Sequence, residues 1–182
     1  MLETYPLQLV IGGARSGKSR YAESLFEPYL PGAIYIATAQ AFDDEMRERI
    51  TVHQRQRGDL WETVEAPMEL ASTVEVRSAS RRPILVDCLT LWLTNVMLSD
   101  GDVGSAVAKL TSVLKATQSP VVLVSNEVGL GIVPDTPLGR AFRDAQGQLN
   151  QSIAAIADRV VFLAAGLPWQ LKPQLGPSLN ES

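Results

Sequence analysis

One eight-residue stretch has the residue types and the spacing that bind the phosphates of a nucleotide. Residues 12–19 read Gly-Gly-Ala-Arg-Ser-Gly-Lys-Ser and match the pattern G-x-x-x-x-G-K-[ST]. In this pattern glycines let the backbone come close to an anion, so that N–H groups point at phosphate oxygens. Lys18 would reach the β- and γ-phosphates and act in catalysis, and the Ser19 hydroxyl would ligate Mg²⁺. The predicted nucleotide-binding residues of this stretch are Gly12, Gly13, Ala14, Arg15, Ser16, Gly17, Lys18 and Ser19.

The segments on either side supply the context that this motif needs. Residues 7–11 form a short apolar run that ends at the first glycine, as a buried parallel strand would. Residues 19–30 place apolar side chains at helical spacing, and Pro28 is expected to end or distort the last turn. An ordinary glycine-rich turn is the alternative, and the glycine, lysine and serine in register argue against it.

Asp87 and His53 are further candidates for chemistry. Asp87 ends the apolar run of residues 83–87, where a second nucleotide-binding carboxylate would act on Mg²⁺; the alternative is a helix N-cap. His53 is the one histidine of the chain and lies beside Arg55 and Arg57. Neighbouring positive charge favours neutral imidazole, which is a nucleophile. From the residues alone, however, a solvated surface histidine is the favoured interpretation.

A polar loop with glycines follows the most strand-like run of the chain. Residues 126–134 read Asn-Glu-Val-Gly-Leu-Gly-Ile-Val-Pro and come directly after residues 121–125. Such a loop would lie at the ligand-binding end of a parallel sheet. Glu127 could bind metal or substrate, or the segment could only connect two elements, and the residues do not decide between these.

Composition limits the class of protein. The chain has 182 residues, a net charge of −4 and a hydrophobic content of 46%, so one α/β domain with a packed core is expected and a nucleic-acid-binding protein is not. A single cysteine excludes an intramolecular disulfide and fits a reducing, cytoplasmic location. We find no signal peptide at the N-terminus and no apolar run long enough for a membrane span.

Alternating strand and helix patterns predict the fold. Strands are expected at residues 7–11, 33–38, 61–65, 83–87, 121–125, 160–164 and 169–172, with helices at 19–30, 43–57, 68–78, 89–98, 103–116 and 138–157. This order is typical of a mostly parallel sheet covered by helices on both faces, here a P-loop NTPase-like (RecA-like) α/β fold. We expect a single domain over residues 1–173 and a disordered tail over 174–182.

Four stretches, in order, resemble one enzyme family. Residues 12–23 (GGARSGKSRYAE), 35–50 (YIATAQAFDDEMRERI), 84–97 (ILVDCLTLWLTNVM) and 122–172, which contains NEVGLGIVP, are similar to the bifunctional adenosylcobinamide kinase / adenosylcobinamide-phosphate guanylyltransferases of cobalamin biosynthesis. The resemblance covers most of the chain, and the NEVGLGIVP stretch is far more specific than the phosphate loop. The few residues before the first strand and the polar tail depart from the family pattern.

The resemblance reverses the interpretation of His53. In the family a histidine three residues after the Arg-Ile pair, matched here by Arg49 and Ile50, accepts GMP from GTP and forms a guanylyl-histidine. The resemblance also implies ATP and GTP as substrates, Mg²⁺, a corrinoid substrate and a homo-oligomer, commonly a trimer. The GTP contacts that it implies beyond the phosphate loop are Ala37, Thr38, Ala39, Gln54, Arg55, Gln56, Arg57, Glu65 and Asp87.

Two other functions stay open at this point. A monofunctional P-loop kinase of another small metabolite would use the same loop and Asp87 and would leave His53 idle. A non-catalytic or regulatory nucleotide-binding module acting on nucleic acid would need a basic stripe, which the acidic composition disfavours.

Overall fold

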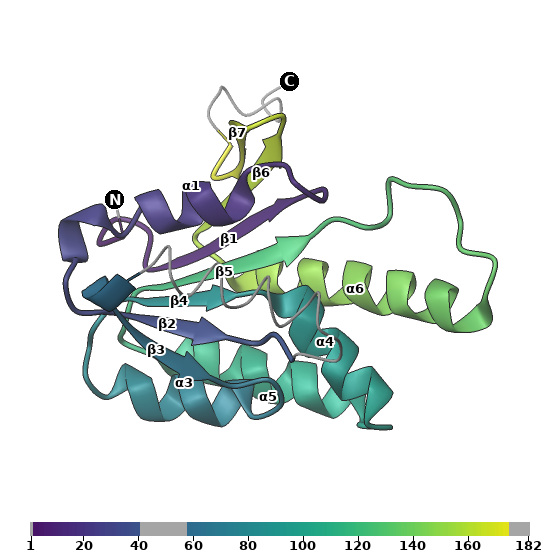
Figure 1. The fold of residues 1–182 in the computed structure, drawn as a ribbon, viewed down its shortest axis with the longest axis horizontal. Helices are drawn as coiled ribbons and strands as arrows, with labels where there is room; N and C mark the ends of the chain where they lie inside the picture. Colours follow the sequence, from purple (N-terminus) through teal and green to yellow (C-terminus); the bar gives the residue numbers. More distant parts are fainter. Residues whose placement is uncertain (1, 41–57, 175–182) are drawn as a thin grey trace, which may run out of the picture.

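A seven-stranded sheet in the order β3-β2-β4-β5-β1-β6-β7 organises the chain (Figure 1). The computed structural model describes residues 2–40 and 58–174. All neighbouring strands are parallel except β6 and β7, which form an antiparallel hairpin at one edge. The strands are β1 Leu7–Gly12, β2 Ala33–Ala37, β3 Trp61–Glu65, β4 Ile84–Asp87, β5 Val121–Asn126, β6 Arg159–Ala164 and β7 Leu167–Lys172. Each predicted strand is confirmed to within two residues.

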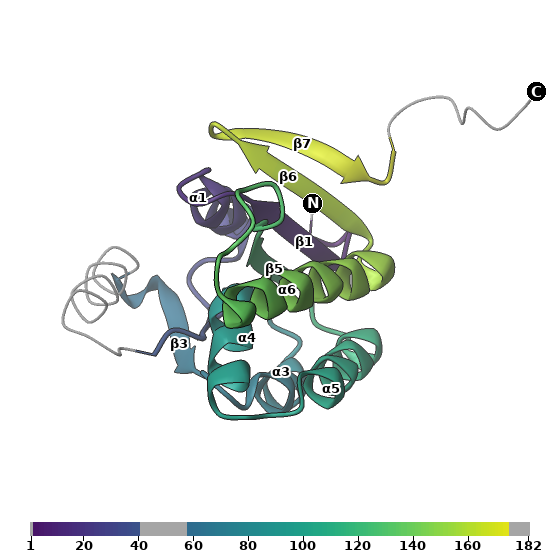
Figure 2. The same cartoon turned by 90° about the vertical axis from the view of Figure 1, so that its right-hand side faces the viewer.

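The helices cover both faces of the sheet, as predicted, but unequally. Figure 2 shows α1 against one face and α3, α4, α5 and α6 against the other. The predicted helix at residues 43–57 lies outside the described residues, and so does the predicted tail except for residue 174. The described helices are α1 Lys18–Ser24, α3 Leu70–Ser78, α4 Leu89–Leu98, α5 Val103–Ala116 and α6 Pro137–Ile156, with 3₁₀ segments at Glu27–Tyr29 and Gly58–Leu60.

The first helix is shorter than the sequence pattern predicts. It ends at Ser24 rather than at residue 30, and a 3₁₀ segment follows at Glu27–Tyr29. The chain tightens there, because Leu25 N–H donates to Ala22 O and Phe26 N–H to Glu23 O, each three residues back. Pro28 has no N–H to continue an α-helix. The helical spacing of the apolar residues therefore persists while the hydrogen bonding changes.

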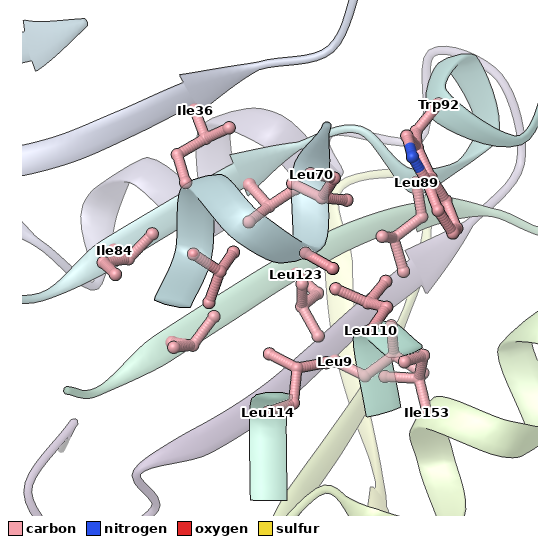
Figure 3. Close-up of a cluster of buried hydrophobic side chains, with 14 of the residues drawn as sticks. Leu9, Ile36, Leu70, Ile84, Leu89, Trp92, Leu110, Leu114, Leu123 and Ile153 are labelled. Atoms are coloured by element: carbon pink, nitrogen blue, oxygen red, sulfur yellow. The ribbon is translucent and has the colours of Figure 1, made fainter. Parts of the chain in front are cut away.

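Two apolar clusters hold the helices to the sheet. The larger joins β-strand side chains to α3, α4, α5 and α6 (Figure 3), and the smaller joins the opposite sheet face to α1. Leu89 and Trp92 of α4 are buried in the larger cluster, and the Trp92 indole N–H donates to Met68 O over 3.1 Å. These clusters make the sheet a rigid frame, so that side chains at the carboxyl ends of its strands have fixed positions.

The long helix α6 has a defined start immediately after the loop that follows β5. Thr136 is its N-cap, with Oγ1 accepting from Gly139 N–H over 3.1 Å, and Pro137 occupies the first helical turn. None of the helices in residues 2–40 and 58–174 is long and apolar enough to cross a membrane.

Candidate nucleotide-binding site

The phosphate-binding motif lies between β1 and α1, in the strand–loop–helix context that the sequence predicts. Gly17 takes the left-handed conformation (φ 94°) and is followed directly by the first helical residue, Lys18. Lys18 is 8% exposed, and its ammonium donates to Gly13 O over 2.8 Å. The Lys18 ammonium therefore lies over the loop, where it could also contact a phosphate bound there.

Gly12 cannot be replaced without moving its neighbours. A Cβ atom at this position would lie 2.5 Å from Leu163 O of β6 and 2.7 Å from Ser16 Oγ. The turn between β6 and β7 also touches the loop, since Gly166 N–H donates to Ser16 O over 2.9 Å. The hairpin thus fixes the loop from outside, a contact that the motif itself does not reveal.

Asp87 and Ser19 meet at the carboxyl edge of the sheet. The Ser19 hydroxyl donates to Asp87 Oδ1 over 3.4 Å, and the Tyr35 hydroxyl donates to Asp87 Oδ2 over 2.5 Å. The N-cap of α4 is Cys88, with no side-chain cap bond. The helix-cap alternative for Asp87 is therefore wrong, and its carboxylate faces the phosphate loop.

These donors suit a nucleotide-bound magnesium ion. Mg²⁺ takes one or two protein oxygens and completes its shell with phosphates and water. The Ser19 hydroxyl and the Asp87 carboxylate are oxygen donors of this kind, from two elements that meet. Within residues 2–40 and 58–174 there is no group of three or more His, Cys, Asp or Glu side chains that could hold a metal alone. The donor set thus fits an ion that arrives with a triphosphate.

Thr38 ties the end of β2 to the end of β4. Its hydroxyl donates to Cys88 O over 2.7 Å and accepts from Cys88 N–H over 2.9 Å, and its side chain is fully buried. Asn95 of α4 donates to Thr38 O over 2.9 Å. The Thr38 side chain therefore fixes the backbone that carries Asp87, and a contact of residues 37–39 with GTP stays a prediction.

The Cys88 thiol is expected to resist modification in the folded protein. Burial, and secondarily the charge of Asp87, raises the pKa of Cys88 from 9.0 to about 11. At neutral pH a thiol reagent should therefore react about 100-fold or more slower with folded than with denaturant-unfolded protein. Equal rates in the two states would contradict the buried position. Because the folded state keeps the proton longer, stability should fall as pH rises from about 9 through about 11.

A buried polar network anchors the segment after β5. Ser125, Gln146 and Asn150 bond one another over 2.7 to 3.0 Å. Asn150 also donates to Asn126 O over 3.0 Å, and Asn126 N–H donates to Thr90 Oγ1 over 2.8 Å. The Asn126 backbone is thereby fixed next to Gly12, its parallel partner in β1. Sequence reasoning missed this network, although Gln146 and Asn150 stand four apart on one helix face.

Glu127 begins the loop beside the phosphate motif. Its N–H donates to Gly12 O over 3.0 Å, and its carboxylate accepts from Gly129 N–H over 2.5 Å. The carboxylate thus shapes its own turn. Glu65 is exposed at the carboxyl end of β3, in register with Ala37 of β2. His53, Gln54, Arg55, Gln56 and Arg57 lie outside the described residues.

Together the sheet order, the loop and the facing carboxylate define a P-loop nucleotide-binding α/β protein. One solved chain of similar fold comes from a structural and biochemical analysis of a type III secretion system ATPase of pathogenic bacteria (TM-score 0.55, 12% identity). The match covers 91% of this chain and 57% of that one, and it supports the predicted fold class alone.

Sequence comparison then gives the family. Residues 8–171 match the family described as cobinamide kinase / cobinamide phosphate guanyltransferase. The bifunctional adenosylcobalamin biosynthesis protein CobP of Pseudomonas aeruginosa is 46% identical over 166 residues, covering 90% of this chain and 96% of the relative. The corresponding CobU protein of Salmonella typhimurium is 38% identical over 179 residues, with 90% and 98% covered. This chain belongs to the cobinamide kinase / cobinamide phosphate guanyltransferase family and is an enzyme, which confirms the resemblance.

Proposed function

We propose that this enzyme phosphorylates adenosylcobinamide and then transfers GMP from GTP to the product, giving adenosylcobinamide-GDP and pyrophosphate. The observation that carries the proposal is the family match over residues 8–171, which includes the assembled loop and Asp87. Bifunctional relatives are matched over nearly their whole length.

In the first reaction a substrate hydroxyl attacks the γ-phosphorus of ATP or GTP, and the nucleoside diphosphate leaves. Backbone N–H groups of residues 12–19 and the Lys18 ammonium would hold the phosphates. Ser19 and Asp87 would hold Mg²⁺, which neutralises charge on the phosphate oxygens when bound. The chain's contribution here is positioning and electrostatic stabilisation, because phosphoryl transfer needs little covalent help.

In the second reaction His53 would act as the nucleophile. Its imidazole nitrogen would attack the α-phosphorus of GTP and form a P–N bond. The bond from the α-phosphorus to the bridging oxygen would break, and pyrophosphate would leave. The phosphate of adenosylcobinamide phosphate would then displace the histidine and take the GMP group. The same loop would thus serve attack at two different phosphorus atoms. The further proposed GTP contacts are Gln54, Arg55, Gln56, Arg57, Glu65 and residues 37–39.

The substrates, the assembly and the location of the enzyme are also proposed. The proposed substrates are GTP, ATP and a corrinoid, and the proposed assembly is a homotrimer in the cytoplasm without nucleic acid. Leu98 of α4 and Leu138 of α6 are each 59% exposed. Such exposed apolar side chains are compatible with subunit contact. Size-exclusion chromatography with light scattering tests the trimer, and a monomer at working concentration would exclude it.

The activity is tested by supplying adenosylcobinamide, ATP, GTP and Mg²⁺ and separating the corrinoids. Adenosylcobinamide phosphate is expected when ATP alone is supplied, and adenosylcobinamide-GDP with pyrophosphate when GTP is added. Accumulation of the phosphate without any GDP product would favour a monofunctional kinase. No change in the corrinoid would contradict both reactions.

A further inference from the structure

We propose that Tyr35 is a positioning residue that holds Asp87 in the orientation needed to bind the nucleotide's magnesium ion. This inference rests on the proposed function, because it assumes that Asp87 acts on that ion. Tyr35 lies in β2, 52 residues from Asp87 in the sequence, and no sequence motif connects the two. The sheet brings them together, since β2 and β4 are parallel neighbours with Ala37 opposite Asp87.

The hydrogen bond between the two side chains is short and specific. The Tyr35 hydroxyl donates to Asp87 Oδ2 over 2.5 Å, whereas Oδ1, the other carboxylate oxygen, faces the Ser19 hydroxyl at 3.4 Å. A bond from a hydroxyl to an ionised carboxylate is shorter and stronger than one between neutral groups. One oxygen of Asp87 is therefore committed to Tyr35, and the other is directed at the motif serine.

The tyrosine ring is itself held rigidly. Tyr35 is 2% exposed, and Trp61 of β3 packs edge-on against it with ring centroids 5.6 Å apart and planes at 86°. Trp61 in turn contacts Phe26, with centroids 5.0 Å apart. This aromatic row fixes where the hydroxyl lies, so the hydroxyl can fix the carboxylate.

Without the hydroxyl, Asp87 would lose its orientation. The terminal torsion of an aspartate is broad, so a carboxylate held only by the long 3.4 Å contact with the Ser19 hydroxyl samples many rotations. Of the two oxygens, Oδ1 would then face Ser19 for only part of the time. The cost would fall on binding of the metal, whereas the phosphate loop, which holds the nucleotide itself, would be unchanged.

The test is the Tyr35→Phe variant, which removes one oxygen atom and keeps the ring. The probe is α,β-methylene-GTP, whose carbon bridge prevents loss of pyrophosphate, titrated with Mn²⁺ followed by electron paramagnetic resonance. The variant is expected to bind Mn²⁺ in the nucleotide complex about tenfold more weakly, the effect of losing one hydrogen bond to a charged group. Its affinity for the nucleotide in EDTA should equal that of the unaltered protein, which also shows that it is folded.

Two further variants separate positioning from a purely structural role. Tyr29 is a partly buried tyrosine that packs against the smaller apolar cluster, to which Tyr35 belongs. Tyr29→Phe also removes one hydroxyl, and it is expected to leave Mn²⁺ binding unchanged. In an Asp87→Asn background, Tyr35→Phe should weaken Mn²⁺ binding no further, because its effect passes through the carboxylate.

Four results would count against the inference. Unchanged Mn²⁺ affinity in Tyr35→Phe, or equal losses with and without Asp87, would overturn the role of Tyr35 and leave the proposed function standing. Absence of nucleotide-dependent Mn²⁺ binding in the unaltered protein would instead contradict the metal site and the proposed function together. Weaker nucleotide affinity in EDTA would show that Tyr35 acts on the loop and not on the ion.

Discussion

Lys18→Ala is expected to lower the rates of both reactions by about 100- to 1000-fold, the loss typical when one preorganised donor to developing charge is removed. Lys18 is nearly buried and its ammonium donates to Gly13 O over 2.8 Å, so the position of the ammonium is set before a nucleotide arrives. If one phosphate loop serves attack at both the γ- and the α-phosphorus, both reactions should need the positive charge of Lys18.

The two rates are measured separately, as adenosylcobinamide phosphate formed with ATP and as pyrophosphate released from GTP. Lys109→Ala, an exposed lysine of α5, is the matched control and should leave both rates unchanged. Loss of one reaction alone would show that the two triphosphates do not share the loop. Loss of neither would remove Lys18 from the mechanism.

His53→Asn is expected to abolish guanylyl transfer and to leave the kinase reaction close to that of the unaltered enzyme. Asparagine keeps a polar side chain of similar size but cannot form the covalent intermediate that splits the transfer into two steps. The phosphate loop, Lys18 and Asp87 stay intact in this variant. Adenosylcobinamide phosphate should therefore accumulate when ATP and GTP are both present.

Corrinoid chromatography reads both steps of this variant in one experiment. The kinase reaction serves as the internal control for folding and nucleotide binding. Formation of adenosylcobinamide-GDP at an undiminished rate would show that another group, or direct attack by the substrate phosphate, carries the transfer. Failure of both reactions would show that His53 also contributes to the kinase step.

Much of the fold could be predicted, because each buried strand leaves a local apolar run. The runs at residues 7–11 and 121–125 predict the neighbouring strands β1 and β5, and the motif between β1 and α1 locates the phosphate loop. The sequence pattern predicts too long a first helix, because apolar spacing continues through Phe26 although the backbone has already tightened before Pro28. Spacing alone does not distinguish these hydrogen-bond patterns.

The contacts that organise the site could not be predicted, because they join residues far apart in the chain. Tyr35 and Asp87 are 52 residues apart, and the Gly166 turn meets the loop at Ser16 only through the β6–β7 hairpin. Asp87 could be a ligand or a helix cap on sequence grounds, and only the structure shows that Cys88 is the cap and that the Asp87 carboxylate meets Ser19. Sheet order, not local pattern, assembles these groups.

We propose above that one phosphate loop presents GTP to His53 for attack at the α-phosphorus. The most direct test of this attack is the intact mass of the protein after incubation with GTP and Mg²⁺ in the absence of corrinoid. We predict a mass increase of one GMP moiety in the unaltered enzyme, labile to acid and absent from His53→Asn. An unaltered enzyme that releases no pyrophosphate and gains no mass, or a His53→Asn variant that gains the same mass, would contradict a guanylyl-histidine intermediate at His53.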